Sequence, residues 1–167
     1  TMLQGKTKVG KNCTLGPDTQ LTDVICGDGN HLNRVYAHSC ELGDNNEIGP
    51  FVHLRPETCL HNDIKIGNFV EVKNSDVDDG TKLPHLIYCG DSDLGKNVNF
   101  GCGTVTVNFD GKNKHRCTID EHAFIGCNTN LVAPVHVGTR AFTAAGSTIT
   151  KDVPAKALAV GRAKQVN

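Results

Sequence analysis

Residues 119–148 divide into IDEHAF, IGCNTN, LVAPVH, VGTRAF and TAAGST when the chain is cut every six residues. An aliphatic residue opens each block except the last, where Thr143 holds the position. A period of six fits neither an α-helix nor a simple alternating strand. It fits a short strand followed by a tight corner, and three such sides close a coil of about 18 residues. The stretch therefore predicts a solenoid of stacked coils joined by parallel strands.

The same period extends over most of the chain. Aliphatic residues recur every six positions from Leu42 to Val72, and the next residue is often glycine, which we expect to adopt the corner conformation. Residues 9–153 would supply about eight coils. The phase is unclear between Cys26 and Leu42, and we expect Pro154 to end the last coil. We predict one all-β domain, a triangular β-helix of hexapeptide repeats over 1–153, followed by a C-terminal arm over 154–167.

Composition narrows the functional classes. The 167 residues carry a formal net charge of −1, which gives no support to bulk binding of nucleic acid or anionic membranes. No apolar run is long enough to cross a bilayer and no secretory leader is visible, so we expect a cytoplasmic protein. None of the eight cysteines forms a C-x-x-C pair, and Cys26 and Cys89 fall at apolar positions of the repeat. We interpret most cysteines as small buried hydrophobes rather than disulfides or zinc ligands.

Two shortened steps change the register. The steps from Val72 to Val77 and from Cys89 to Leu94 are five residues long. One coil in this region therefore holds 17 residues, which places Cys89 on Val72, while Leu54 lies a full 18 residues before Val72.

This register stacks two cations. Arg55 and Lys73 occupy the position after the aliphatic residue on adjacent coils, where glycine is usual, and Tyr88 lies at the same corner. Coils stack about 4.8 Å apart, and like charges so close are unfavourable unless an anion lies between them. We favour an anion site over the alternative of two solvated surface cations.

The same count places Phe100 over Leu83 and Cys102 over His85, with Asn99 beside that corner. A single histidine is usually structural or solvent-exposed, and His85 differs from the others only in its neighbours.

The six-residue period fails at VTVNFDGKNKHRC, residues 105–117. If the period continued past Phe100, Thr106 and Lys112 would both lie in the core. An unpaired lysine cannot remain there. We therefore predict a loop at about 105–118 that leaves the prism, either as a basic flap over the site or as a solvated hairpin. A filled prism has no deep cavity of its own, so a concave site would need this loop or a second prism against its face.

Several longer runs are more specific than the spacing: GPFVHLRP (49–56), GNFVEVK (67–73), HLIYCGD (85–91), GKNVNFGCGTVTVNFDGKNKH (95–115), FIGCNTNLVAPV (124–135), AAGSTITKDV (144–153) and RAKQ (162–165). From about residue 49 to 165 the chain resembles the C-terminal half of the bifunctional bacterial N-acetylglucosamine-1-phosphate uridyltransferase and glucosamine-1-phosphate N-acetyltransferase. The resemblance implies left-handed coiling, a homotrimer with sites between subunits, and closure of each site by the C-terminal arm.

The resemblance also implies a reaction: acetyl-CoA-dependent N-acetylation of glucosamine 1-phosphate, with no metal required, as a step towards UDP-N-acetylglucosamine for peptidoglycan. Neither nucleic acid nor membrane would be a partner. His85 would be the general base. Arg55, Lys73, Tyr88 and Asn99 would hold the sugar phosphate. The residues implied to contact acetyl-CoA are Cys102, Asn108, Phe109, Lys114, Cys127, Ala145 and Arg162.

The chain departs from the family pattern at three positions. The family has tyrosine at Phe109, serine at Cys127 and glycine at Glu57, and the first two changes can lower acetyl-CoA affinity. The nucleotidyl-transfer half has no counterpart in these residues, because the repeat is already present at Val9. We expect an isolated acetyltransferase domain or a natural stand-alone relative, without uridyltransferase activity.

In such a reaction the sugar amine attacks the thioester directly, so no cysteine nucleophile is required. A histidine base is suitable because its ordinary pKa is about 6.5. The oxyanion donors would be backbone N–H groups near Cys102–Gly103 or the Asn108 amide.

Three alternatives stay open: another amino-sugar acceptor, a catalytically decayed assembly module, and a metalloenzyme similar to γ-carbonic anhydrase. The last requires three histidines on one zinc ion, and His115 and His122 match its spacing poorly.

Overall fold

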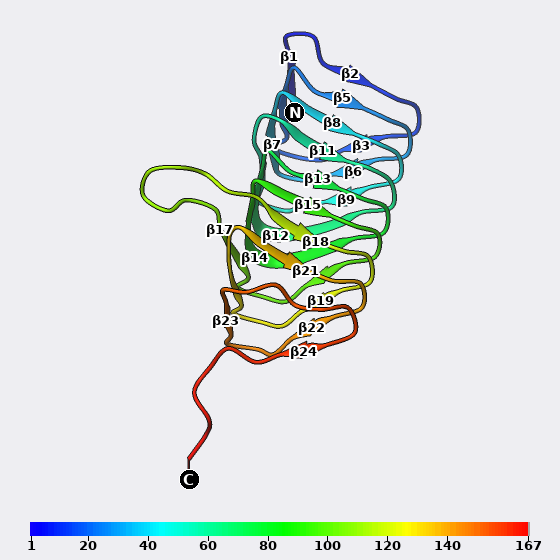
Figure 1. Ribbon diagram of the computed structural model, residues 1–167. Coiled ribbons are helices and arrows are strands. Elements are labelled where there is room, and N and C mark those ends of the chain that lie inside the picture. Colours follow the sequence, from blue (N-terminus) through cyan, green and yellow to red (C-terminus); the bar gives the residue numbers. More distant parts are fainter. Residues whose placement is uncertain (167) are drawn as a thin grey trace.

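The computed structural model describes residues 1–166, and this part of the chain contains 24 strands and no helix. The chain winds as a left-handed triangular coil of about nine turns (Figure 1). All strands pair in parallel with strands of the neighbouring coils. The predicted parallel β-helix is therefore confirmed. No helix in residues 1–166 is long and apolar enough to cross a membrane.

Three columns of strands form the faces of the prism. The first face consists of β2 (Lys8–Val9), β5 (Ile25–Cys26), β8 (Cys40–Leu42), β11 (Thr58–Leu60), β13 (Asp76–Val77), β15 (Ser92–Leu94), β18 (Cys117–Ile119) and β21 (Val135–Val137). The second face consists of β3 (Thr14–Leu15), β6 (His31–Leu32), β9 (Glu47–Ile48), the first parts of β12 (Lys65–Lys73) and β14 (Lys82–Gly90), β16 (Asn99–Phe100), β19 (Phe124–Ile125), β22 (Phe142–Thr143) and β24 (Leu158–Ala159).

The third face consists of β1 (Met2–Gln4), β4 (Gln20–Thr22), β7 (Val35–His38), β10 (Val52–Leu54), the second parts of β12 and β14, β17 (Val105–Val107), β20 (Asn130–Val132) and β23 (Thr148–Ile149). Strands β12 and β14 thus continue around the corner between the second and third faces. This corner and the one after the third face carry the residues that the sequence singles out.

The core is one column of side chains that point inward from all three faces. Leu54 pairs with Val72, and Val72 pairs with Cys89, as the two shortened steps predict. All three are fully buried, and Phe100 is the largest residue in the column. Removing such a column from water is the main favourable term for a fold with few large rings.

The unclear segment between Cys26 and Leu42 belongs to the same column. Leu32, Ala37 and Leu42 are buried, and Ala37 pairs with Leu54. The steps from Leu32 to Ala37 and from Ala37 to Leu42 are both five residues long, so the count by sixes loses its phase there.

The expected role of the repeat glycines is wrong except at Gly49 (φ 118°). The left-handed backbone conformation falls later in the corner, for example at Asn97 (φ 54°), three residues after Leu94. In the shortened steps it falls two residues after the inward side chain, as at Asn74 (φ 44°). Glycine follows the aliphatic residue because the next coil is too close for a side chain. A Cβ on Gly67 would collide with the carbonyl oxygen of Pro84.

The loop and the arm are both shorter than expected. Val105–Val107 is strand β17 of the prism, and Thr106 is fully buried in the core column. Only residues 108–116 project, as the long loop in Figure 1. Past Pro154 the coil continues through β24, which pairs with β22, and the tail leaves the prism only after Gly161. The last residue of the expected arm, 167, lies outside the described residues.

The cysteine interpretation holds for half of the set. All eight cysteines are free, and Cys26, Cys40, Cys89 and Cys117 are buried, while Cys127 is exposed. Burial raises the pKa of the Cys89 thiol to about 11 and that of the Cys117 thiol to about 12, so neither is reactive at neutral pH.

We predict that Gly67→Ala destabilises the fold by about 1–3 kcal/mol, because its new methyl group meets backbone of the next coil. Gly16→Ala is the matched control, since its Cβ would lie 3.3 Å from its nearest neighbour. Thermal denaturation should rank Gly67→Ala well below Gly16→Ala. Equal midpoints would contradict the close-approach explanation.

Candidate functional site

Three cations converge beside the corner after the third face. Arg55 and Lys73 follow the paired residues of adjacent coils, and the Arg55 N–H donates to the Val72 carbonyl at 2.8 Å. The projecting loop returns Lys114 to the same place, where its side chain lies beside that of Lys73. This contact lowers the pKa of Lys114, and the charge of Arg55 adds to the effect.

A buried carboxylate lies beneath this cation cluster. The side chain of Asp91 is only 5% exposed and lies 3.5 Å from the Lys73 ammonium. It accepts a hydrogen bond from Asn74 Nδ2 at 2.5 Å and another from Asn108 Nδ2. Burial alone would raise the pKa of Asp91, but the hydrogen bonds from Asn74 and Asn108 and the charge of Lys73 outweigh it, and the pKa is lowered.

Asp91 also fixes the amide of Asn108. Asn108 Nδ2 donates both to Asp91 and to the Tyr88 hydroxyl, at 3.3 Å for the latter. These two contacts commit both amide hydrogens. The backbone N–H of Gly103 is committed to the Leu86 carbonyl at 2.9 Å. Neither group is therefore free to stabilise an oxyanion in this arrangement.

Two acidic residues of the site were not singled out from the sequence. Asp91 ends the HLIYCGD run, but its burial depends on the shortened corner after Cys89. Glu71 Oε1 accepts a 2.8 Å hydrogen bond from Arg55 Nη1 at a partly exposed position. Glu71 directly precedes Val72, which pairs with Leu54. The sequence could therefore have placed Glu71 on the coil next to Arg55, as a possible partner for its charge.

His85 lies at the corner where β14 passes from the second face to the third. Its side chain is exposed, and within residues 1–166 its ring makes no hydrogen bond or ion pair. Tyr88 lies three residues further along the same strand. The structure thus places His85 and Tyr88 on one strand but leaves the imidazole open to a ligand.

Asn99 lies apart from the other predicted acceptor residues. It pairs with Lys82 at the start of β14, on the second face. Arg55, Lys73 and Tyr88 lie on or just after the third face. A single protomer therefore does not assemble all four.

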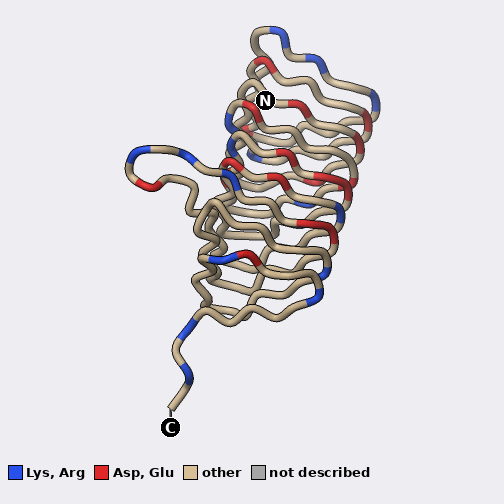
Figure 2. Tube along the Cα trace, viewed as in Figure 1, with Lys and Arg blue, Asp and Glu red and all other residues tan. Residues whose placement is uncertain are grey.

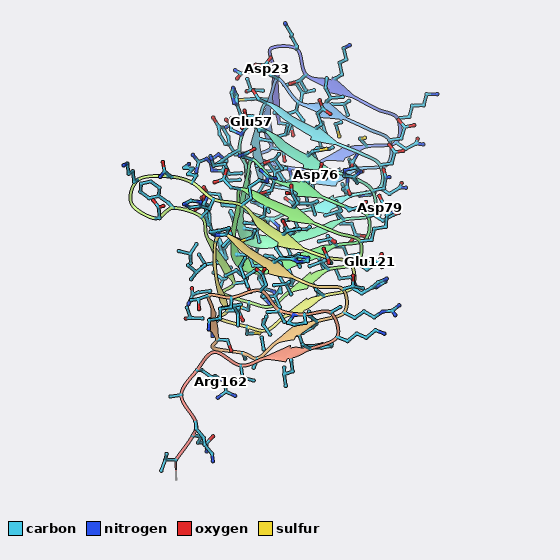
Figure 3. The ribbon with its side chains drawn as sticks, in the orientation of Figure 1. Asp23, Glu57, Asp76, Asp79, Glu121 and Arg162 are labelled. Carbon is cyan, nitrogen blue, oxygen red and sulfur yellow. The ribbon has the colours of Figure 1, made fainter. Side chains whose placement is uncertain are left out.

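Most of the residues assigned to acetyl-CoA form a vertical row below His85. Cys102 and Cys127 follow one another on successive coils, since Asn128 N–H donates to the Cys102 carbonyl at 2.7 Å. Gly146 N–H donates in turn to the Cys127 carbonyl at 2.8 Å, which places Ala145 next in the row. Arg162 packs against Gly146 at the base of the row, where Figure 3 labels it. Phe109 lies instead on the loop with 55% of its surface exposed, and Lys114 lies in the cation cluster.

An open groove of about 730 Å³ runs along the third face beside Tyr88 and Glu71. The rings of Phe51 and Phe69 stack at its edge with centroids 5.4 Å apart, and each ring is 55% exposed. The edge is therefore strongly apolar for a protein surface, as is typical of surfaces that another chain covers.

No protein-family model matches the chain. It is 52% identical over 167 residues to the bifunctional protein GlmU of Geobacillus sp. strain WCH70 and 52% identical over 166 residues to that of Listeria innocua. It is 50% identical to that of Halalkalibacterium halodurans. These alignments cover 99–100% of the chain but only 36–37% of each relative, so the chain spans about a third of the curated relatives it matches.

Solved structures support the fold. The polysialic acid O-acetyltransferase OatWY superposes with a TM-score of 0.51 at 15% identity, over 96% of this chain and 85% of that one. A point mutant of AntD, an N-acyltransferase from Bacillus cereus in complex with dTDP-4-amino-4,6-dideoxyglucose and coenzyme A, superposes with a TM-score of 0.50 at 16% identity, over 93% and 79%.

We predict that Asp91 stabilises the folded protein in a pH-dependent way. Its folded-state pKa is lowered, so its contribution is present above its unfolded pKa of about 3.9 and is lost as pH falls through the folded value. Asp91→Asn should cost about 1–3 kcal/mol at pH 7, and its deficit relative to wild type should shrink in acid. Urea denaturation at pH 7 and pH 3 measures both. Glu57→Gln is the control, because Glu57 lies at an exposed corner (Figure 3), and it should lose little stability at either pH. A loss of stability in Asp91→Asn that does not change with pH would contradict the charge argument.

Proposed function

The chain is homologous over its whole length to the C-terminal part of the bifunctional GlmU proteins, and we propose that it transfers the acetyl group of acetyl-CoA to the amine of glucosamine 1-phosphate. The product would be N-acetylglucosamine 1-phosphate, which leads in the cytoplasm to UDP-N-acetylglucosamine for peptidoglycan. The observation that carries this proposal is the convergence of Arg55, Lys73 and Lys114.

A sugar phosphate suits this cluster. Its phosphate carries close to two negative charges at neutral pH. The Arg55 guanidinium offers two parallel donors, and the two lysines offer point charges. Glu71 and Asp91 balance part of the positive charge and hold Arg55 and Lys73 in place. Lys114 was assigned to acetyl-CoA from the sequence, and its position beside Lys73 supports a role on the acceptor phosphate instead.

In the proposed reaction the amine nitrogen of the sugar attacks the thioester carbon. A C–N bond forms, the C–S bond breaks, and the coenzyme leaves as a thiolate. His85 accepts the proton that the amine must lose, and a proton then neutralises the thiolate. The open imidazole of His85 fits this task, because a base must reach its substrate without first breaking a strong internal contact.

Coenzyme A would lie along the row of Cys102, Cys127 and Ala145, with the guanidinium of Arg162 available to a phosphate. The loop would cover it through Asn108 and Phe109. The exposed Cys127 thiol and the Phe109 ring are weaker hydrogen-bonding groups than the serine and tyrosine of the family pattern, so affinity for the coenzyme should be reduced rather than lost.

We further propose that the active form is a homotrimer. The apolar edge around Phe51 and Phe69 needs a cover, and Asn99 lies on the wrong face to join Tyr88 within one protomer. A neighbouring copy packed on the third face would cover the apolar edge and would bring its own Asn99 towards Tyr88.

The metalloenzyme alternative is less well supported. In residues 1–166, two groups of side chains could hold a metal ion, and His61 is the one histidine in each. Neither group includes His115 or His122.

His85→Ala is expected to lower kcat about 10²- to 10⁴-fold, as loss of a general base does, while coenzyme A binding stays nearly unchanged. Saturating turnover and coenzyme A titration measure the two effects. His31→Ala, which removes an exposed histidine from β6, should behave as wild type. Near-normal turnover of His85→Ala would rule out His85 as the base.

Arg55→Ala, Lys73→Ala and Lys114→Ala should each raise the KM for glucosamine 1-phosphate by roughly tenfold to over a hundredfold, because each removes a charge-assisted hydrogen bond worth about 1.5–3 kcal/mol. The KM for acetyl-CoA should change far less. Lys112→Ala is the matched control, since Lys112 lies exposed on the same loop outside the cluster.

Unphosphorylated glucosamine separates the interpretations of that experiment. It should be a poor substrate for the wild type and lose little more in the variants. Equal losses on both acceptors would mean that the cations serve the fold or the coenzyme.

A further inference from the structure

The first face carries a row of ionisable side chains that the proposed reaction does not use. Glu41, Cys59, Asp76 and Asp93 lie on consecutive strands β8, β11, β13 and β15 and are paired in register. Figure 2 shows acidic positions on coil after coil along this side of the prism. Carboxylates stacked at strand spacing repel one another unless a cation lies among them.

Three different ligand types meet within this row. Cys59 lies between the buried Thr58 and Leu60, so its side chain points outward, and His61 follows two residues later on the same face. Asp76 is the in-register neighbour of Cys59. The Cys59 Sγ, a His61 ring nitrogen and an Asp76 carboxylate oxygen all lie within 4.8 Å of one another, and His61 Nε2 is 2.9 Å from Asp76 Oδ1.

His61 also belongs to a second group, with Asp78 and Asp79. Asp79 is already committed, because it pairs with the Lys96 ammonium at 2.9 Å and accepts the Asn62 N–H at 3.0 Å. Within residues 1–166, the first group has no lysine or arginine bound to its carboxylate, and Asp76 pairs with His61 itself. Arg116 pairs with Asp93, with its Nε at 3.0 Å, and leaves the Asp76 carboxylate to His61.

We propose that Cys59, His61 and Asp76 form a binding site for Zn²⁺ or a similar borderline-soft divalent ion. Thiolate, imidazole and carboxylate together match the donors that Zn²⁺ prefers, whereas Mg²⁺ and Ca²⁺ prefer oxygen alone. Three protein ligands leave a fourth tetrahedral position for water. The ion would cross-link β11 and β13, which belong to two successive coils.

The charge balance of the site favours a cation. The carboxylates of Glu41 and Asp76 are in register with Cys59 on either side of it, and no cation is paired with Asp76 other than His61 among residues 1–166. On binding, the thiol proton is released and the ion takes its place among Cys59, His61 and Asp76.

The site lies away from the row assigned to coenzyme A. Figure 3 labels Asp76 and Asp79 on the strands and edge of the prism, remote from Arg162 at the base. The test of this site measures metal binding alone, so it does not depend on activity or on the proposed function.

Co²⁺ titration of the metal-free full chain tests the proposal directly. We expect saturation at one Co²⁺ per chain, a near-ultraviolet thiolate-to-cobalt charge-transfer band, and displacement of Co²⁺ by Zn²⁺. Cys59→Ser should abolish the band, and His61→Ala and Asp76→Asn should each weaken Co²⁺ binding by about tenfold or more. The expected losses for His61→Ala and Asp76→Asn are minimum values, because removal of a group that only supports a metal ligand already lowers metal affinity about 10- to 100-fold.

Two control variants match the site in chemistry. His136 Nε2 makes the same 2.9 Å contact with Asp120 on this face, but no third ligand joins that pair in the described chain. Cys127 is an exposed thiol on a different corner. His136→Ala and Cys127→Ser should both keep the band and its titration midpoint.

The wild type offers an independent readout that needs no variant to fold. Saturating Zn²⁺ should strongly slow alkylation of Cys59 by iodoacetamide, because a metal-bound sulfur is not a free nucleophile, while Cys127 reacts as before. Mass spectrometry of the peptides separates the two. A wild type without the cobalt band, a band that survives in Cys59→Ser, or a Cys59 alkylation rate that Zn²⁺ does not change would each overturn the proposal.

Discussion

The stacking distance between coils, about 4.8 Å, is the constraint on which the rest of the structure depends. Each outward position has the same position of the next coil directly above and below it. Where backbone meets backbone, as at Gly67 and Pro84, no side chain fits. Where outward side chains are present, those at equivalent positions of successive coils form rows along the prism axis. Charged, apolar and possible metal-binding side chains therefore lie next to others in the same row. Arg55 with Lys73 and Cys59 with Asp76 are two results of this one constraint.

The proposed acceptor site lies where the repeat is broken. Both shortened steps that follow Val72 and Cys89 lie at the cation corner. In these steps the left-handed residue falls two positions after the inward side chain, and Asn74 and Asp91 are those residues. Their side chains meet beneath Lys73, and the Asp91 carboxylate then holds Asn108 at the root of the loop. A strictly regular coil would place these polar groups differently, so loss of two residues from the repeat supplies the site with its buried acid.

The sequence predicted the scaffold well because one period dominates it. The column of Leu54, Val72 and Cys89 and the exclusion of Lys112 both followed from counting residues. The segment around Ala37 was missed because consecutive shortened steps leave no phase to follow. The boundary at Pro154 was wrong because proline is tolerated in a corner, after which β24 still finds a partner strand. The position of Lys114 could not be predicted, since the path of a loop depends on its own local contacts rather than on any period.

In the proposed reaction, cations from two coils and one loop hold the acceptor phosphate. The most direct measurement is a crystal structure with glucosamine 1-phosphate and coenzyme A bound. We predict that the phosphate lies within hydrogen-bond distance of Arg55, Lys73 and Lys114, with the sugar amine facing His85. A phosphate bound away from this cluster, or an amine that faces no histidine, would contradict it.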